Sequence, residues 1–301
     1  MANSIREFVT NSSEAEQRVA ARNPLRRFLR RAARHRLFVV GFIITLALII
    51  TSVFAPVFAT ADPFEADFSQ MLASPSSEHL FGTDYLGRDL FSRIIYGGRF
   101  SLLVAILSMA LSGLVGLLLG ITAGFLRGPV ETGIMAFIDL MFAIPGLLLA
   151  LTISVLLGPS TQNLIIALAV IYVPILCRVS RGAVIAVSQL PYIESARAIG
   201  VSNWRIMLLH LLPNAGAPVI VQITIGLAWT ILSEAALSFL GFGAQPPDPS
   251  WGLILAGGRK YLNTHPEMSV FPGIAIAISV LGFNLLGDGL RDLLDPTLRE
   301  R

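Results

Sequence analysis

The residues that could catalyse a reaction or bind a metal are few and scattered along this chain. There is one cysteine, Cys177, and the four histidines form neither an HExxH motif nor a pair at ligand spacing. No GxSxG segment is present, and the only lysine, Lys260, precedes Tyr261, so the Gly-Lys-Ser/Thr sequence that holds nucleotide phosphates is absent. We therefore expect no catalytic residue, no metal ligand and no cofactor in this chain, and no ATP hydrolysis by the chain alone.

The polar segment Leu190–Asn214 lies between two apolar runs and carries residues that suit contact with another protein. Ala196 and Gly200 are four positions apart and would share one helix face, where small side chains allow deep seating in a groove of a partner. Gly200 suits a left-handed cap at the end of that helix, and Glu194 lies near its start, where the helix dipole favours an acid. The alternative, an ordinary interfacial helix, leaves the small face unexplained.

Several polar side chains fall within apolar segments. A carboxylate in lipid is costly and usually faces a bundle interior, a cavity or the interface. Glu234, Asp139 and Asn284 are therefore candidates for a polar pathway through the membrane. The alternative is that such groups hold helices together, with Asp139 paired to a neighbouring arginine.

The composition indicates that lipid surrounds the elements that carry these residues. The chain is 54% hydrophobic and 14% charged, with a mean hydropathy of +0.72, whereas soluble domains carry about 25% charged residues. A bilayer core about 30 Å thick requires about 20 apolar residues per helix. The sequence predicts an all-α, polytopic membrane protein with six transmembrane helices. These are expected at Leu37–Ala59, Phe100–Leu126, from near Thr132 to the turn Gly158–Asn163, Leu164–Val187, Ala215–Leu240 and Met268–Gly287.

Prolines mark three places along these spans. Pro145 and Pro174 each remove a helical hydrogen bond, so we expect kinks in the third and fourth spans. The run Trp204–Leu212 is amphipathic, and Pro213 is expected to mark the return of the chain into the membrane.

The basic residues predict the orientation. Of the 22 basic residues, 17 lie on the side of the N-terminal tail, and nine of those precede Leu37. Because basic loops resist translocation, both termini and Leu190–Asn214 are expected in the cytoplasm. The A-x-A pattern at Ala59–Ala61 follows an apolar stretch too long for a signal peptide, so the first span is expected to be uncleaved. The basic tail suits a helix on the anionic inner leaflet rather than nucleic-acid binding.

These expectations divide the chain into four parts. They are a cytoplasmic basic tail (1–36), a first transmembrane helix with an extracytoplasmic loop (37–99), a core of five helices (100–290) and a cytoplasmic C-terminal tail (291–301).

The sequence ESARAIG, followed after a fixed gap by LLP, resembles the EAA loop of ATP-binding-cassette importer permeases, E-A-A-x3-G-x9-I-x-L-P. Ser195 replaces an alanine of that pattern, and His210 stands where isoleucine is usual. The serine leaves the docking role intact, whereas His210 departs from the usual packing of the next helix. The positions that agree are Glu194, Ala196, Gly200, Leu212 and Pro213.

Three further segments are similar to signature segments of the dipeptide/oligopeptide permease family, in its C-type inner-membrane subunit. They are His79–Leu102, Leu237–Gly252 and Phe283–Arg299, and the resemblance extends from Leu37 to the C-terminus. It implies the type I importer permease fold, with a cytoplasmic coupling helix at about 192–202, in the bacterial inner membrane.

The resemblance also implies partners. They are a second, homologous permease, two ATP-binding subunits that hold ATP and Mg²⁺, and an extracytoplasmic solute-binding protein. Peptide is the expected solute class, and glutathione, nickel and oligosaccharides are alternatives within the family. Nickel is less attractive because the chain offers no His or Cys cluster. An ATP-independent secondary transporter or a membrane-embedded enzyme are rival classes, but neither explains the EAA-like segment.

The extracytoplasmic segments suggest a docking surface for the binding protein. The candidates are Trp251, Arg88 and Asp89, in segments rich in acids, glycines and prolines. The alternative, which we favour for Gly87–Asp89, is that these residues fix turns and pair locally.

Overall fold

The computed structural model describes residues 24–294, which form helices and connecting loops without a β-strand. The all-α prediction is therefore confirmed. The predicted tails 1–36 and 291–301 lie partly outside the described residues. The helices are α2 (Pro24–Ala32), α3 (Arg36–Val53), α4 (Ala55–Phe58), η1 (Phe68–Gln70), α5 (Leu90–Leu126), α6 (Gly128–Phe142), α7 (Gly146–Leu157), α8 (Thr161–Ser188), α9 (Pro191–Ala198), α10 (Asn203–Ile206), η2 (Met207–Leu211), α11 (Leu212–Phe239), α12 (Trp251–Gly258), η3 (Arg259–Tyr261) and α13 (Glu267–Leu294).

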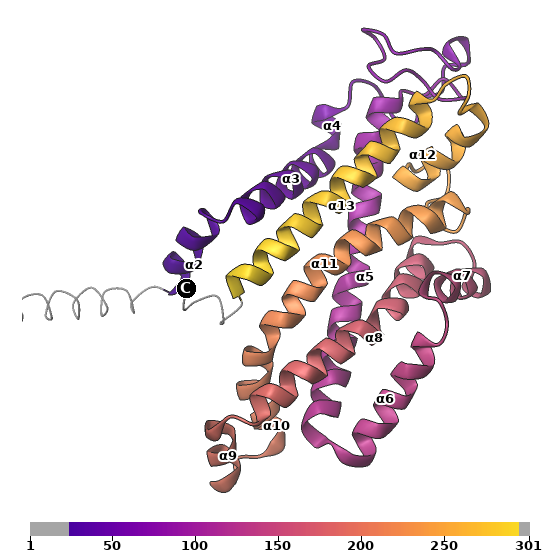
Figure 1. Cartoon of the computed structure of the whole chain (residues 1–301). Coiled ribbons are helices and arrows are strands. Elements are labelled where there is room, and N and C mark those ends of the chain that lie inside the picture. The colour runs from indigo at the N-terminus through magenta and orange to yellow at the C-terminus, as the bar shows by residue number, and fades with distance from the viewer. Residues whose placement is uncertain (1–23, 295–301) are drawn as a thin grey trace, which may run out of the picture.

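Five helices of the described chain are long and apolar enough to cross a membrane, and a sixth crossing results if α6 and α7 count as one broken span. The five are α3, α5, α8, α13 and the continuous helix Asn203–Phe239, which joins α10, η2 and α11. The chain is thus a multi-pass membrane protein. In Figure 1, α9 and α10 lie at one end of the bundle, and the loop between α4 and α5 lies with α12 at the other end. We call these the α9 end and the α12 end.

Several span boundaries differ from the prediction. The first span ends at Val53 rather than Ala59, because the chain turns at Phe54 and starts α4 with a proline in its first turn. The second begins at Leu90 rather than Phe100, because the Asp89 carboxylate accepts from Ser92 N and starts the helix there. Apolar periodicity alone does not detect a polar cap of this kind.

The third predicted span is broken rather than kinked. The axes of α6 and α7 differ by 88° across a short linker that ends at Pro145. Proline cannot donate a helical hydrogen bond, and it disfavours helical geometry in the residue before it. At 15 residues α6 is about 22 Å long, shorter than a bilayer core. By contrast, Pro174 lies inside a continuous α8, and the kink expected there remains a prediction.

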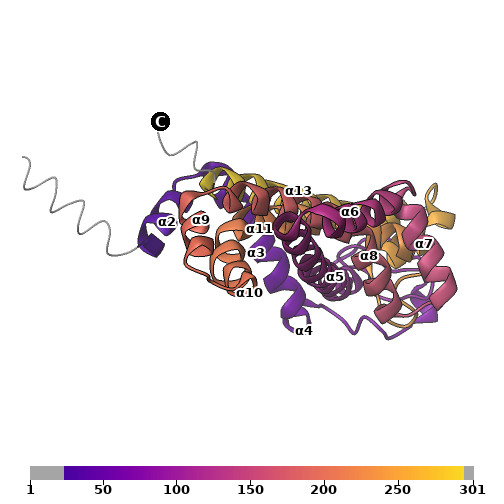
Figure 2. The ribbon, with the colours of Figure 1, turned by 90° about the horizontal axis from the view of Figure 1, so that it is seen from below.

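The helix α5 packs closely against α8 through glycines. A Cβ on Gly116 would lie 2.7 Å from Leu176 Cβ, and Gly120 meets Ser180 in the same way. Small residues allow this approach of two helices within a membrane. Figure 2 shows α6 and α7 on the side of the bundle away from α2 and α3.

Two apolar clusters lie at opposite ends of the bundle. At the α12 end, Trp251 and Ile254 pack with Leu90, Ile231 and Phe283. At the α9 end, the cluster joins α5, α8, α9 and the start of the long helix Asn203–Phe239. Its buried members are Ile121, Phe125, Val184, Ile193, Ala196, Ile206, Met207, Leu211 and Ala215, and we call it the α9 cluster.

Candidate functional site

Helix α9 lies within the range expected for a coupling helix, and its ends explain its length. Pro191 occupies the first turn, where a missing N–H is tolerated. At the other end, Gly200 N donates to Arg197 O and Val201 N donates to Ala196 O, each at 3.0 Å. Gly200 has φ +80°. These two bonds form a Schellman motif, so the predicted left-handed cap at Gly200 is confirmed.

One face of α9 is anchored in its own chain. Ile193 and Ala196 are buried and belong to the α9 cluster, in contact with the apolar ends of α5 and α8. The prediction that Ala196 shares a partner-facing surface with Gly200 is therefore wrong in this structure. A short helix between two spans must bury its own apolar stripe, and the small side chain of Ala196 lies on that stripe.

The opposite face of α9 and the start of α10 are exposed. Ile199 is 81% exposed and Trp204 is 65% exposed. Glu194, Ser195 and Gly200 are also exposed. We call these five residues the docking face. Large apolar side chains exposed among polar ones mark interaction sites, and tryptophan is frequent among residues that dominate binding energy.

Sequence reasoning missed Ile199 and Trp204. Two signals were available. Ile199 lies directly before the capping Gly200, and Trp204 lies four residues after it. Both are large apolar residues within a polar segment. The pattern did not show on which side of the chain they would lie.

The end of the EAA-like pattern lies inside a continuous helix. Leu212 is half-buried and Pro213 is exposed, and the five residues before them form the π-helical turn η2. Pro213 has no N–H, and a π turn is a common way for a helix to absorb such a local fault. The helix of the fifth span therefore begins at Asn203 rather than at the predicted Ala215. The return of the chain into the membrane at Pro213 remains a prediction. His210 lies in this turn, with its ring 6.2 Å from that of Tyr192 in α9.

Glu234 lies on α11 where that helix meets α5 and α12. Its side chain is fully buried, and Oε1 accepts from Ser238 Oγ at 2.6 Å. The hydroxyls of Ser101 and Ser250 face the same carboxyl group. Glu234 Oε2 and Ser101 Oγ have no hydrogen-bond partner among residues 24–294. The hydrogen bond that the carboxyl group makes among the described residues thus lies within α11, and its predicted pathway role remains a prediction.

Asp139 joins α6 to α8. Asp139 Oδ1 lies 2.6 Å from Arg178 Nη2, and Glu131 pairs with Arg181 along the same helices. The alternative that Asp139 pairs with a neighbouring arginine is confirmed. Exposed ion pairs contribute at most about 1 kcal/mol to the stability of the folded protein. These two pairs therefore set the register of α6 against α8 more than they stabilise the packing of the two helices. Asn284, the third pathway candidate, is half-buried on α13.

The candidates at the α12 end form internal contacts. Arg88 Nη2 lies 2.7 Å from Asp84 Oδ2. Asp89 caps α5 and lies 2.9 Å from His79 Nδ1. Arg88 and Asp89 are both buried. The favoured alternative of local pairing is therefore confirmed for this segment.

Trp251 is also internal. It is 2% exposed, and its Nε1 donates to Ile94 O at 2.8 Å. The indole lies against Gly97 and Gly98 of α5, where a Cβ would approach the ring. The prediction that Trp251, Arg88 and Asp89 touch a binding protein directly is thus corrected for this conformation, because all three support the α12 end from within. Among residues 24–294, no group of three or more His, Cys, Asp or Glu is arranged to hold a metal.

Comparison with solved structures shows the fold. This chain matches a chain in the inward-facing conformations of the MetNI methionine ABC transporter with a TM-score of 0.57 at 20% identity, over 68% of this chain and 98% of that one.

Sequence comparison identifies relatives that match nearly end to end. The dipeptide transport system permease protein DppC of Alkalihalophilus pseudofirmus is 42% identical over 289 residues, 96% of this chain and 95% of the relative. The di/tripeptide transport system permease protein DppC of Pseudomonas aeruginosa is 40% identical, over 96% and 97%. The glutathione transport system permease protein GsiD of Pectobacterium atrosepticum is 39% identical, over 93% of each chain.

Two family models cover most of the chain. Residues 23–75 match the N-terminal transmembrane domain of oligopeptide transport permease C. Residues 116–300 match the inner membrane component of binding-protein-dependent transport systems. The chain therefore belongs to the family of binding-protein-dependent transport system inner membrane components, in its dipeptide/oligopeptide permease C branch.

Proposed function

We propose that this chain is the transmembrane permease subunit of an ATP-driven importer of di- and oligopeptides. In this proposal it forms half of the translocation pathway with a second, homologous permease. Two ATP-binding subunits, which hold ATP and Mg²⁺, contact it from the cytoplasm, and an extracytoplasmic binding protein delivers the peptide. The observation that carries the proposal is the docking face, with its exposed Ile199 and Trp204, in a chain of this family.

The docking face is well placed to transmit movement. Its helix α9 is fixed through Ile193 and Ala196 to the α9 cluster, where the ends of α5, α8 and the long helix Asn203–Phe239 meet. When ATP draws the partner subunits together, a displacement of α9 moves these helix ends with it. The solute pathway then opens alternately to each side. The ATPase can shift the equilibrium between the two states only by the difference between its binding free energies for them.

The proposed orientation places the α9 end and both termini in the cytoplasm. The distribution of arginines supports it, since basic loops are retained on that side. Single cysteines introduced at exposed Ser195 and at exposed Glu65 should test it. In intact spheroplasts, a membrane-impermeant maleimide should label position 65 and spare position 195. The reverse pattern would contradict the orientation.

The names of the relatives support peptides as the solute class. Two transport dipeptides or di- and tripeptides, and a third transports glutathione, which is itself a modified tripeptide. The test is uptake of labelled dipeptides, longer peptides and glutathione by cells that lack this chain and by cells that carry it. Mass spectrometry of the ligand retained by the cognate binding protein guides the choice of substrates. Uptake of none of these solutes would contradict the peptide class.

Dependence on ATP separates the proposal from a secondary transporter. Proteoliposomes with the complete complex should accumulate peptide only when ATP and the binding protein are both supplied. Accumulation driven by an ion gradient, without ATP-binding subunits, would favour the rival class.

A further inference from the structure

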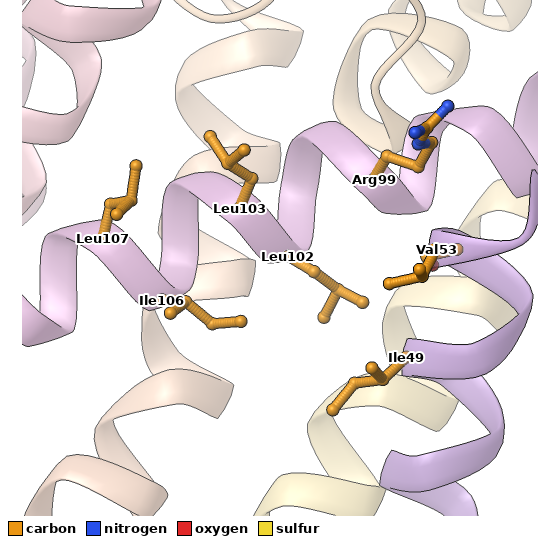
Figure 3. A pocket seen from close by; sticks show the side chains of 8 residues that line it. Ile49, Val53, Arg99, Leu102, Leu103, Ile106 and Leu107 are labelled. Carbon is orange, nitrogen blue, oxygen red and sulfur yellow. The ribbon is translucent and has the colours of Figure 1, made fainter.

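A groove separates α3 from α5 near the α12 end of the bundle (Figure 3). Its cavity volume is about 420 Å³. The two helices touch where Gly98 meets Ser52, and they diverge from there toward the α9 end. The groove is lined by Ile49, Ser52, Val53, Arg99, Leu102, Leu103, Ile106 and Leu107.

The walls of the groove are aliphatic, and it has a single charged group. Leu103, Ile106 and Leu107 are each nearly half exposed. In Figure 3, Leu102 and Ile106 point from α5 toward the space beside α3, whereas Leu103 and Leu107 project on the other side of the α5 ribbon. Arg99 lies at the end near the loops, is exposed, and has its guanidinium 5.7 Å from the centre of the Tyr96 ring. Within residues 24–294 Arg99 has no acidic partner. The groove is therefore amphipathic, with aliphatic walls and, at the end near the loops, a cation that has no acidic partner in this part of the chain.

The chemistry of the groove favours a lipid over a protein helix. Arg99 and Leu107 are separated by about 12 Å along α5, so a molecule that fills the groove needs an apolar part and an anionic end. A partner helix lying across the mouth would cover Arg99 and would have to supply an acid for it.

We propose that this groove is a phospholipid site. One acyl chain lies between α3 and α5 against Leu102 and Ile106, and the phosphate is bound by Arg99. The lipid fills the space that α3 and α5 leave as they diverge, and it thereby fixes the first span against the core. The site requires only that these helices cross the membrane. Its assignment to the outer leaflet rests on the orientation proposed above.

The test uses the complete transporter, purified in detergent with phosphatidylglycerol that carries a photoreactive diazirine in its acyl chain. Irradiation should attach the lipid to this chain at positions 49–53 and 102–107, as mapped by peptide mass spectrometry. Ile106→Trp fills the groove and should lower labelling at these positions at least fivefold. Arg99→Ala should lower it about fivefold, which is the effect of one cation at an anionic membrane surface. Arg259→Ala, which removes another exposed arginine of the α12 end, is the matched control and should label as the unchanged protein does.

Complex assembly and basal ATP hydrolysis, measured on each variant, show that it is folded. Labelling that persists in both Ile106→Trp and Arg99→Ala would overturn the proposal. So would the absence of lipid adducts together with a cross-link from a photoreactive residue at position 106 to the second permease, because protein would then occupy the groove. Failure of the peptide-uptake test would leave the lipid adducts unaffected, so the two proposals fail separately.

Discussion

Gly200 allows the sharpest test of the proposed coupling surface. It follows Ile199, the residue that caps α9, in a Schellman motif with φ +80°, and a Cβ added there would meet no atom within 4 Å. An ordinary L-residue at this position must adopt the left-handed backbone conformation, which costs about 1–2 kcal/mol. We call this the backbone cost. Any steric cost beyond that must come from a partner.

Three substitutions separate these costs. Gly200→Ala adds mainly the backbone cost, so about 1 kcal/mol predicts a loss of roughly fivefold in peptide-stimulated ATP hydrolysis. Gly200→Leu adds overpacking of about 1–3 kcal/mol against a partner, so its activity should fall at least about fivefold further. Gly200→Asn is close to leucine in size, but asparagine tolerates the left-handed region. If a partner packs here, activity should be highest in Gly200→Ala, lower in Gly200→Asn and lowest in Gly200→Leu.

The assay is ATP hydrolysis by the complete transporter in lipid nanodiscs, with and without the loaded binding protein. Gly241→Leu is a matched control. Gly241 follows α11 in the same motif, with φ +91° and no atom within 4 Å of an added Cβ, but it lies at the opposite end of the bundle. Gly241→Leu should retain peptide stimulation. If Asn retains activity while Ala and Leu lose it equally, the role of Gly200 is confined to the backbone. Normal coupling in Gly200→Leu would refute the reasoning altogether.

Three further predictions concern single side chains. Trp204→Ala should weaken binding of the ATP-binding subunits by about 2 kcal/mol, because Trp204 is exposed on the docking face. Co-purification over a salt series measures this, and unchanged retention of the subunits would show that Trp204 is not in the interface. Glu234→Gln should melt within a few degrees of the unchanged protein. Glu234→Leu should lose about 1–3 kcal/mol of stability, because it leaves Ser238 Oγ without its hydrogen-bond partner, and equal melting of the two variants would contradict this. Trp251→Phe should lose about 1 kcal/mol of stability, because it removes the hydrogen bond to Ile94 O, but its affinity for the binding protein should be unchanged. A loss of affinity at unchanged stability would show that Trp251 is a contact residue.

The sequence predicted those features that depend on local physics. Apolar length located the spans, and glycine after a short helix predicted the left-handed cap at Gly200. The sequence was less informative where the geometry of a helix depends on packing between distant segments. Pro145 indicates a disturbed helix, but whether the result is a slight kink or an 88° break depends on how α7 packs against α8. That packing involves residues far apart in the chain.

The orientation of side chains at the candidate site was the least predictable feature. Ala196 and Ile199 both lie in a short helical segment, and each is compatible with an internal or an external face. Burial of Ala196 follows from the ends of α5 and α8, which approach α9 only in the folded chain. Trp251 is similar, since the glycine pair in α5 that accommodates its ring is about 150 residues away in sequence.

In the proposed importer, the separation of anchor and contact on α9 would explain how so short a helix couples two proteins. A helix of eight residues has too little surface to bind two partners through the same side chains. Ile193 and Ala196 hold it to the spanning helices, whereas Ile199 and Trp204 are exposed and form the proposed contact with the ATPase. Because the buried contacts are closely packed, a force applied to the exposed residues displaces the ends of three helices rather than deforming α9. Weakening the anchor, for example by Ile193→Ala, should therefore uncouple ATP hydrolysis from transport without releasing the ATPase, whereas Trp204→Ala should release it.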